Sequence, residues 1–375
     1  MIDIDALREI NYIIEFDATS STYKYALLKS VINATQKYEH LITNNKSRAS
    51  IPLGLIVEEW LCDYMPFVFA NIKQQNSGTV LDKEVELHYH NIFNMLGIER
   101  ASSWEYAYKE FMQAYRYKLI SNRELSHEFL KLAKKMARKI VTMPMKYTGK
   151  ERYTIFQPHT TTFGDIKINA KQTYDAGFIV HSFGMFDISI EHYYIFRYLG
   201  QSLYGTSTIQ SKWKSKTIAL NKTTTQASEI EKMLGEAFDN RDTTTARAIF
   251  TGDQECVWSG RTLLQDNMDI DHVLPYSVWM NNDLWNLLPT QRELNQHKKK
   301  DKIPTRSLIK KRSEIIKHYW NVYDKTLQQL FRSQLSISLT GDMIYMNNNY
   351  DAAIESLCSK SDYLIQDRGL VGFEI

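Results

Sequence analysis

The residues best suited to chemistry lie close together, in the stretch from Cys256 to Pro304. Asp271 and Asn295 offer the hard oxygen ligands that Mg²⁺ or Mn²⁺ prefers, and two protein ligands leave coordination positions for water and a phosphate. An imidazole titrates near neutral pH, so His272 is suited to deprotonating a water molecule. A metal ion on the scissile phosphate, with a base beside it, is a minimal phosphodiesterase.

The elements that carry these residues must bring them together. Met268–Val273 alternates between apolar and polar residues, which predicts a strand that runs into a loop. Gln291–Lys302 is rich in helix formers and is followed by Pro304, which predicts a short helix. Between them, Asn286 opens an apolar turn at residues 287–289. The order strand, loop and helix predicts that the polar side chains meet at one point.

This prediction carries one geometric condition. Adjacent residues of a strand point to opposite faces of the sheet. Asp271 and His272 therefore converge only if the strand ends or bulges at that position.

The stretch resembles an HNH (ββα-metal) nuclease motif, in the subset that begins with Asp-His and ends with Asn. The three motif positions fall on His272, Asn286 and Asn295, and the family-typical lysine falls on Lys298. The resemblance implies that His272 is the general base and that Asp271 and Asn295 hold one divalent ion, Mg²⁺ or Mn²⁺. It also implies that Asn286 is structural and pins the loop that orients the base.

The sequence D-L-W-N-L-L-P-T, followed by K-K-K-D-K-I-P, is also similar to HNH domains of bacterial restriction and phage-defence nucleases. The resemblance covers residues 256–304 and implies a role in restriction or another antiviral defence.

The chain departs from many HNH domains at the positions that bind a structural zinc. Cys256 stands alone, Ser259 occupies its partner's place, and Gln291 and Leu294 occupy the places of the second pair. One thiol cannot form a tetrahedral zinc site. We therefore predict no structural zinc and a ββα unit held by packing, with contributions from three tryptophans, Trp258, Trp279 and Trp285.

Composition limits the class of protein. The chain has 375 residues, of which 43% are hydrophobic and 24% charged, with a formal net charge of +3. It is therefore no polycation, and a DNA-binding face must be local. Three widely spaced cysteines argue against a disulfide scaffold and fit a reducing cytoplasm. The sequence lacks an apolar run of membrane-spanning length, so we predict a soluble cytoplasmic protein with no membrane partner.

The whole chain is expected to be α+β and mainly helical. We predict a helical recognition or regulatory region at residues 1–150 and a small mixed β/α region at 151–222. The HNH nuclease domain, with C-terminal helices, is expected at 223–375. Short apolar runs predict strands of the small β element at residues 153–156, 166–168 and 178–180.

Two groups of basic residues have competing interpretations. One stripe lies in a predicted helix near residues 131–139, and it is either a solvated helix face or a face that contacts DNA phosphates. The other follows Asn295, where we favour clamping of the nucleic-acid backbone. Its residues nearest the motif, which we predict to bind nucleic acid, are Lys298, Lys299, Lys300 and Lys302.

The leading hypothesis is a metal-dependent HNH endonuclease that hydrolyses DNA. One site cuts one strand, so a double-strand break needs a homodimer or two successive visits. The rival hypotheses are a degenerate module that binds nucleic acid without cutting, and a nuclease subunit that a partner defence protein or a small ligand activates. The chain has no G-x-x-x-x-G-K-[ST] phosphate-binding loop, so ATP hydrolysis would need a partner.

Overall fold

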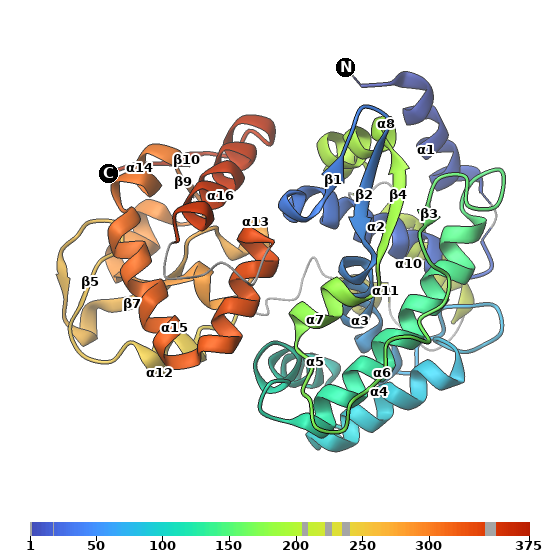
Figure 1. Ribbon diagram of the computed structural model, residues 1–375, viewed down its shortest axis with the longest axis horizontal. Helices are drawn as coiled ribbons and strands as arrows, with labels where there is room; N and C mark the ends of the chain where they lie inside the picture. The colour runs from blue at the N-terminus through green and yellow to red at the C-terminus, as the bar shows by residue number, and fades with distance from the viewer. Residues whose placement is uncertain (1, 18, 205–208, 222–226, 235–240, 342–349) are drawn as a thin grey trace. The chain divides into compact units, whose positions relative to one another are not determined.

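The computed structural model describes residues 2–17, 19–204, 209–221, 227–234, 241–341 and 350–375. The chain forms two compact units, Met1–Phe238 and Asp239–Ile375, which we call unit 1 and unit 2 (Figure 1). The predicted boundary between residues 222 and 223 lies outside the described residues, and the predicted division at residue 150 stays a prediction.

Unit 1 is mainly helical. Its described α-helices are α1 (Ile4–Phe16), α2 (Tyr23–Lys37), α3 (Leu53–Phe69), α4 (Lys83–Leu96), α5 (Trp104–Gln113), α6 (Arg123–Ile140), α7 (Ala176–Ser182), α8 (Ile190–Tyr194), α9 (Gly200–Tyr204), α10 (Ile209–Leu220) and α11 (Ala227–Met233). Helix α3 is buried on nearly every side, because α2, α5, α6 and α7 pack around it. Gly54 permits the close approach to α7, since a Cβ atom there would lie 2.2 Å from the carbonyl oxygen of Val180.

A small antiparallel sheet completes unit 1. Its strands lie in the order β1 (Thr43–Asn44), β2 (Arg48–Pro52), β4 (Met185–Ser189) and β3 (Gln157–Pro158). Strand β4 pairs with β2 so that Phe186 lies opposite Ile51. The small β element expected in this part of the chain is therefore present.

Its strands are not the ones that the sequence predicted. Residues 178–180 lie in helix α7, where the Asp175 side chain caps the helix by accepting a hydrogen bond from the backbone N–H of Phe178. The runs at 153–156 and 166–168 have no regular structure. The predictions failed because a short apolar run fits a buried strand and a buried helix equally well.

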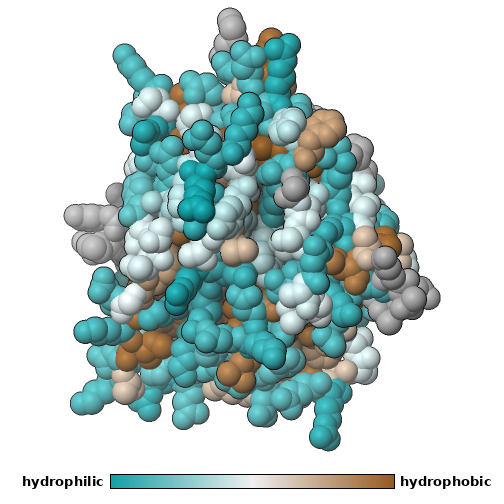
Figure 2. All heavy atoms as spheres, turned by 90° about the vertical axis from the view of Figure 1, so that its right-hand side faces the viewer, coloured by the Kyte–Doolittle hydropathy of each residue, from teal (hydrophilic) through white to brown (hydrophobic). Residues whose placement is uncertain are grey.

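Three lysines of the basic stripe of α6 are paired with carboxylates of their own unit. Lys131 pairs with Glu128, Lys135 with Glu84 and Lys139 with Asp82. These pairs favour the interpretation of a solvated helix face over a DNA-contacting one. The face of the molecule drawn in Figure 2 is mainly hydrophilic, and its hydrophobic residues lie scattered.

Unit 2 combines short strand pairs with helices. The strand pairs are β5 (Gln254–Glu255) with β6 (Thr262–Leu263), β7 (Met268–His272) with β8 (Leu287–Gln291), and β9 (Ile303–Pro304) with β10 (Gly372–Phe373). The described α-helices are α12 (Thr244–Ile249), α13 (Tyr276–Trp279), α14 (Arg306–Lys311), α15 (Ser313–Leu335) and α16 (Asp351–Asp362), and a π-helix spans Leu294–Lys299. The expected mainly helical α+β fold, with a ββα unit followed by helices, is confirmed.

Strand β8 corrects one prediction, because residues 287–289 were expected to form a turn. They pair with β7 in an antiparallel ladder, and Pro289 lies opposite Ile270. Residues 287–290 are all buried, so the strand lacks the alternation that marks a half-exposed strand. Proline is tolerated because each strand of a two-stranded ladder is an edge.

Helix α15 anchors this hairpin. Trp320 Nε1 donates a hydrogen bond of 2.9 Å to the carbonyl oxygen of Trp285, and the Tyr323 hydroxyl donates one of 2.6 Å to the carbonyl oxygen of Leu287. The tryptophans expected to pack here, Trp258, Trp279 and Trp285, are all buried. Each large buried side chain contributes about 1.5–3 kcal/mol, so the hairpin that carries the site is held firmly.

Within the described ranges, no helix is both long enough and apolar enough to cross a membrane.

Candidate active site

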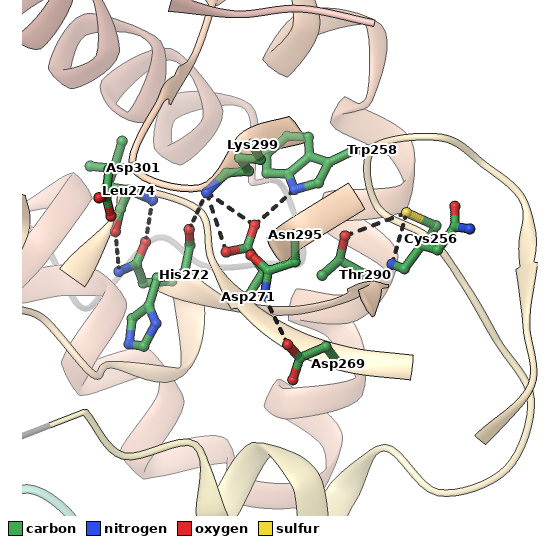
Figure 3. Close-up of polar contacts among 12 residues, drawn as sticks. Cys256, Trp258, Asp269, Asp271, His272, Leu274, Thr290, Asn295, Lys299 and Asp301 are labelled. Atoms are coloured by element: carbon green, nitrogen blue, oxygen red, sulfur yellow. Dashed lines mark hydrogen bonds and ion pairs between the residues drawn. The ribbon is translucent and has the colours of Figure 1, made fainter. Parts of the chain in front are cut away.

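Strand β7 carries two carboxylates on one face. Asp269 and Asp271 are two residues apart and point to the same side, while Ile270 and His272 point to the other. Asp271 is only 5% exposed. Its Oδ2 atom accepts a hydrogen bond of 3.0 Å from Trp258 Nε1 (Figure 3). A carboxylate buried to this degree requires hydrogen-bond donors or a counter-charge.

The strand is regular to its end. Residues pair without a bulge from Met268 opposite Gln291 to His272 opposite Leu287. The Asp271 carboxylate and the His272 ring therefore leave β7 in different directions (Figure 3). The structure places both residues at the end of the hairpin but does not turn both side chains toward one point.

His272 is buried and is oriented by a neighbour that sequence reasoning missed. Its Nε2 atom lies 3.0 Å from Asn282 Oδ1. Burial is the main cause that lowers the pKa of His272 below its usual value, and the bond to Asn282 opposes this only in part. The ring is therefore neutral at pH 7. With Nε2–H donating to the Asn282 carbonyl oxygen, Nδ1 keeps the lone pair that a general base needs.

Asn286 holds the loop that carries Asn282. Its side chain is fully buried, and its Oδ1 atom accepts a hydrogen bond of 2.8 Å from the backbone N–H of Leu274. Its Nδ2 group donates to the carbonyl oxygens of Leu274, at 3.1 Å, and Asn281, at 3.0 Å. These bonds tie both ends of the loop together, an arrangement that suits the structural role implied for this residue.

Asn295 lies on the π-helix and faces the first of the two carboxylates. Its Nδ2 group donates a hydrogen bond of 2.9 Å to Asp269 Oδ2. Arg247 from α12 also bonds to Asp269. Asp269 was not singled out from the sequence, although the alternation Asp-Ile-Asp in a predicted strand placed it on the face of Asp271.

The basic residues after the motif divide into two groups. Lys298, Lys300 and Lys302 are exposed and accessible to a phosphate backbone. Lys299 was predicted to bind nucleic acid with them, but its side chain is fully buried and its Nζ atom lies 3.0 Å from Asp271 Oδ2. Adjacent residues of a helix point in different directions. Lys299 therefore faces β7, while its neighbours Lys298 and Lys300 face solvent.

The thiol of Cys256 lies at the position where some HNH domains bind zinc. Its Sγ atom accepts hydrogen bonds from the backbone N–H groups of Ser259, at 3.4 Å, and Gln291, at 3.3 Å. Burial raises the pKa of this thiol, but the hydrogen bonds from Ser259, Thr290 and Gln291 outweigh burial and lower it overall. The lone sulfur is thus hydrogen-bonded within the protein. Ser259 and Gln291, which stand at two of the other zinc-ligand positions, both lie against it.

The oxygen atoms around β7 have the chemistry of a divalent-ion site. In the part of the chain that the structure describes, no group of three or more His, Cys, Asp and Glu side chains is placed to hold a metal ion. The local set is two carboxylates and a carboxamide, Asp269, Asp271 and Asn295, which are hard oxygen donors. Asp271 already contacts one cation, the Lys299 ammonium group. The donor types therefore suit a hard divalent ion, but Asp271 is open to one only when the Lys299 ammonium group has left it.

The residue after the π-helix adopts a strained backbone conformation. Lys300 has φ 50° and ψ −124°, and the N–H of Lys302 donates a hydrogen bond of 2.9 Å to the carbonyl oxygen of Lys299. This is a type II′ turn with lysine at the position that favours glycine. We expect Lys300→Gly to stabilise unit 2 by about 1 kcal/mol, measured as slower hydrogen exchange of the surrounding peptides. Lys298→Gly, inside the helix, should destabilise it by about 1 kcal/mol, and faster exchange in Lys300→Gly would contradict the assignment of strain.

Comparison with protein families identifies the class of unit 2. A family model described as HNH endonuclease matches residues 249–305, which include the β7–β8 hairpin and the π-helix. The chain thus carries an HNH endonuclease domain, and HNH nucleases generally depend on a divalent metal ion. A second model, described as a domain of unknown function (DUF8808), matches residues 3–235. This is more than half of the chain, which therefore belongs to that family. The comparisons found no matching curated protein and no matching solved structure.

Proposed function

We propose that this protein is a divalent-metal-dependent endonuclease that hydrolyses phosphodiester bonds of DNA. The main support is the state of His272, which is buried, neutral at pH 7 and held through Nε2 by Asn282. A neutral histidine that is fixed through one ring nitrogen has the protonation state and the free lone pair of a general base. The HNH match over the same residues gives the reaction class.

Each residue of the site has a proposed role. His272 accepts a proton from water at Nδ1, and Asn286 keeps the loop with Asn282 in place. Asp271 and Asn295 hold one Mg²⁺ or Mn²⁺ ion. When bound, such an ion stabilises the charge on the phosphate and on the departing oxygen. The exposed lysines, Lys298, Lys300 and Lys302, contact the nucleic-acid backbone.

The biological role proposed for this activity is restriction or another anti-phage defence in the cytoplasm. It is supported by the resemblance of the motif to bacterial defence nucleases. Residues 1–150 and 151–222 would then serve recognition, regulation or docking of a partner. Because one site cuts one strand, a double-strand break requires a homodimer or a second cleavage event.

A plasmid assay tests the proposal. Purified protein is incubated with supercoiled DNA and Mg²⁺ or Mn²⁺, beside samples that contain a chelator. We expect conversion to open circles that the chelator abolishes. The variant His272→Ala should be inactive, and His318→Ala, which removes an exposed histidine of α15, should cut like wild type. Cleavage by His272→Ala at the wild-type rate would reject the proposed base.

A second candidate is a nuclease subunit that stays silent until a partner or a ligand activates it. The ion pair between Lys299 and Asp271 favours it, because the carboxylate of the proposed ion site is already neutralised. Cleavage that begins only when a neighbouring gene product is added would support this candidate. Metal binding and DNA binding with no cleavage under any condition would indicate a module that only binds nucleic acid.

A further inference from the structure

Lys299 is a buried lysine with a nearly complete set of partners. Its side chain has no exposed surface. The Nζ atom lies 3.0 Å from Asp271 Oδ2 and 3.2 Å from Oδ1, and it donates a hydrogen bond of 2.7 Å to the carbonyl oxygen of His272. It also lies 5.9 Å from the centre of the Trp258 ring. A lysine is almost never fully buried unless it is paired.

The pairing follows from matched spacings on two elements. Asn295 and Lys299 are four residues apart on the π-helix, which is close to one full turn, so their side chains lie on the same side of it. Asp269 and Asp271 are two residues apart on β7, a separation of about 7 Å. The helix lies along the strand, so Asn295 meets Asp269 and Lys299 meets Asp271 (Figure 3). Lys299 thus belongs to the same row of contacts as the proposed ion ligands.

This arrangement leaves no room for a second cation at Asp271. Both carboxylate oxygens contact the ammonium group, and Oδ2 also accepts the hydrogen bond from Trp258. A divalent ion bound to the same carboxylate would lie within a few ångströms of a positive charge in a water-poor environment, where repulsion is strong. Lys299 and the ion therefore exclude each other.

We propose that Lys299 is an internal counter-cation that holds Asp271 in the metal-free protein and leaves it when a divalent ion binds. This inference rests on the proposed function, because it takes Asp271 as a ligand of the ion. In the metal-bound state the turn rearranges, and the Lys299 ammonium group moves into solvent, where the side chains of Lys298 and Lys300 already lie. The strained conformation of Lys300, with φ 50°, lies at the point where this rearrangement has to occur.

Chemical labelling of the wild-type protein gives the first test. An amine-acetylating reagent is applied without metal and with Mg²⁺, and acetylation of each lysine is measured by mass spectrometry. We expect Lys299 to be protected without metal and to react at a rate close to that of Lys298 when Mg²⁺ is bound. Lys298 is the internal control, because it is exposed and should react in both samples. Protection of Lys299 at saturating Mg²⁺ would overturn the inference.

Calorimetric titration with Mn²⁺, in the absence of DNA, gives the second test. Lys299→Met removes the competing charge and should bind Mn²⁺ roughly tenfold or more tightly than wild type, as is typical of coupled binding. Lys298→Met should bind like wild type. Equal or weaker binding by folded Lys299→Met would overturn the inference, and if that variant does not fold, the labelling experiment decides.

The two proposals fail in different ways. If neither wild type nor Lys299→Met binds Mn²⁺, the proposed function loses its metal and the inference falls with it. If wild type binds Mn²⁺ and Lys299 stays protected, the ion is held without displacement of the lysine. In that case only the inference is wrong, and Asp269 with Asn295 becomes the binding pair.

Discussion

The variant His272→Ala is expected to cut supercoiled plasmid about 10²–10⁴ times more slowly than wild type, the usual contribution of a general base. The loss follows from the ring's position, since His272 is buried and bonded through Nε2 to Asn282. It is measured as the initial rate of open-circle formation at saturating Mg²⁺. Mn²⁺ affinity should stay within a few-fold of wild type, because His272 faces away from the Asp271 carboxylate.

Asn282→Ala separates orientation of the ring from its chemistry. This variant keeps the base but removes the oxygen that the Nε2–H group contacts. We expect a smaller loss of rate, of about tenfold, the cost of one hydrogen bond of about 1.4 kcal/mol. A loss as large as that of His272→Ala would show that Asn282 does more than hold the imidazole. No loss in either variant would place the base elsewhere.

The variant Asp271→Ala should lower the free energy of unfolding around the hairpin by about 3–5 kcal/mol, the cost of breaking a buried ion pair by removing one partner. The Lys299 ammonium group would stay fully buried without its carboxylate. The measurement is hydrogen exchange of peptides that cover β7 and β8, because it isolates this region from unfolding of unit 1. Exchange in the variant should be much faster than in wild type.

Two further variants control this result. Asp271→Leu combined with Lys299→Met removes both charges and should recover most of the lost stability. Asp269→Ala breaks a pair with the half-exposed Arg247 and a hydrogen bond from Asn295, and it should cost about 1–2 kcal/mol. If Asp269→Ala and Asp271→Ala destabilise the hairpin equally, burial does not control the strength of these pairs.

Several features could be predicted from the sequence because they depend on local patterns. The alternation at Met268–His272 predicted strand β7, and the helix-forming residues before Pro304 predicted the helix that carries Asn295. Strand β8 was missed because burial on both faces removes the alternation, and α7 was mistaken for a strand because its apolar run is short. A local pattern predicts a strand or a helix from the spacing of its apolar and polar residues. Where a segment is wholly buried, all its residues are apolar or small, and this spacing disappears.

The amino-acid sequence by itself determined the chemical types at the site and their order: an acid and an imidazole at the end of a strand, and a carboxamide on the following helix. Only the tertiary structure decided which partner each received. In the folded protein, His272 is hydrogen-bonded to Asn282, Asn295 is hydrogen-bonded to Asp269, and Asp271 is paired with Lys299. The reason is physical. Residues far apart in the chain meet according to how a helix lies along a strand, and one lysine in a run of three turns inward because only one helical direction faces the buried carboxylate.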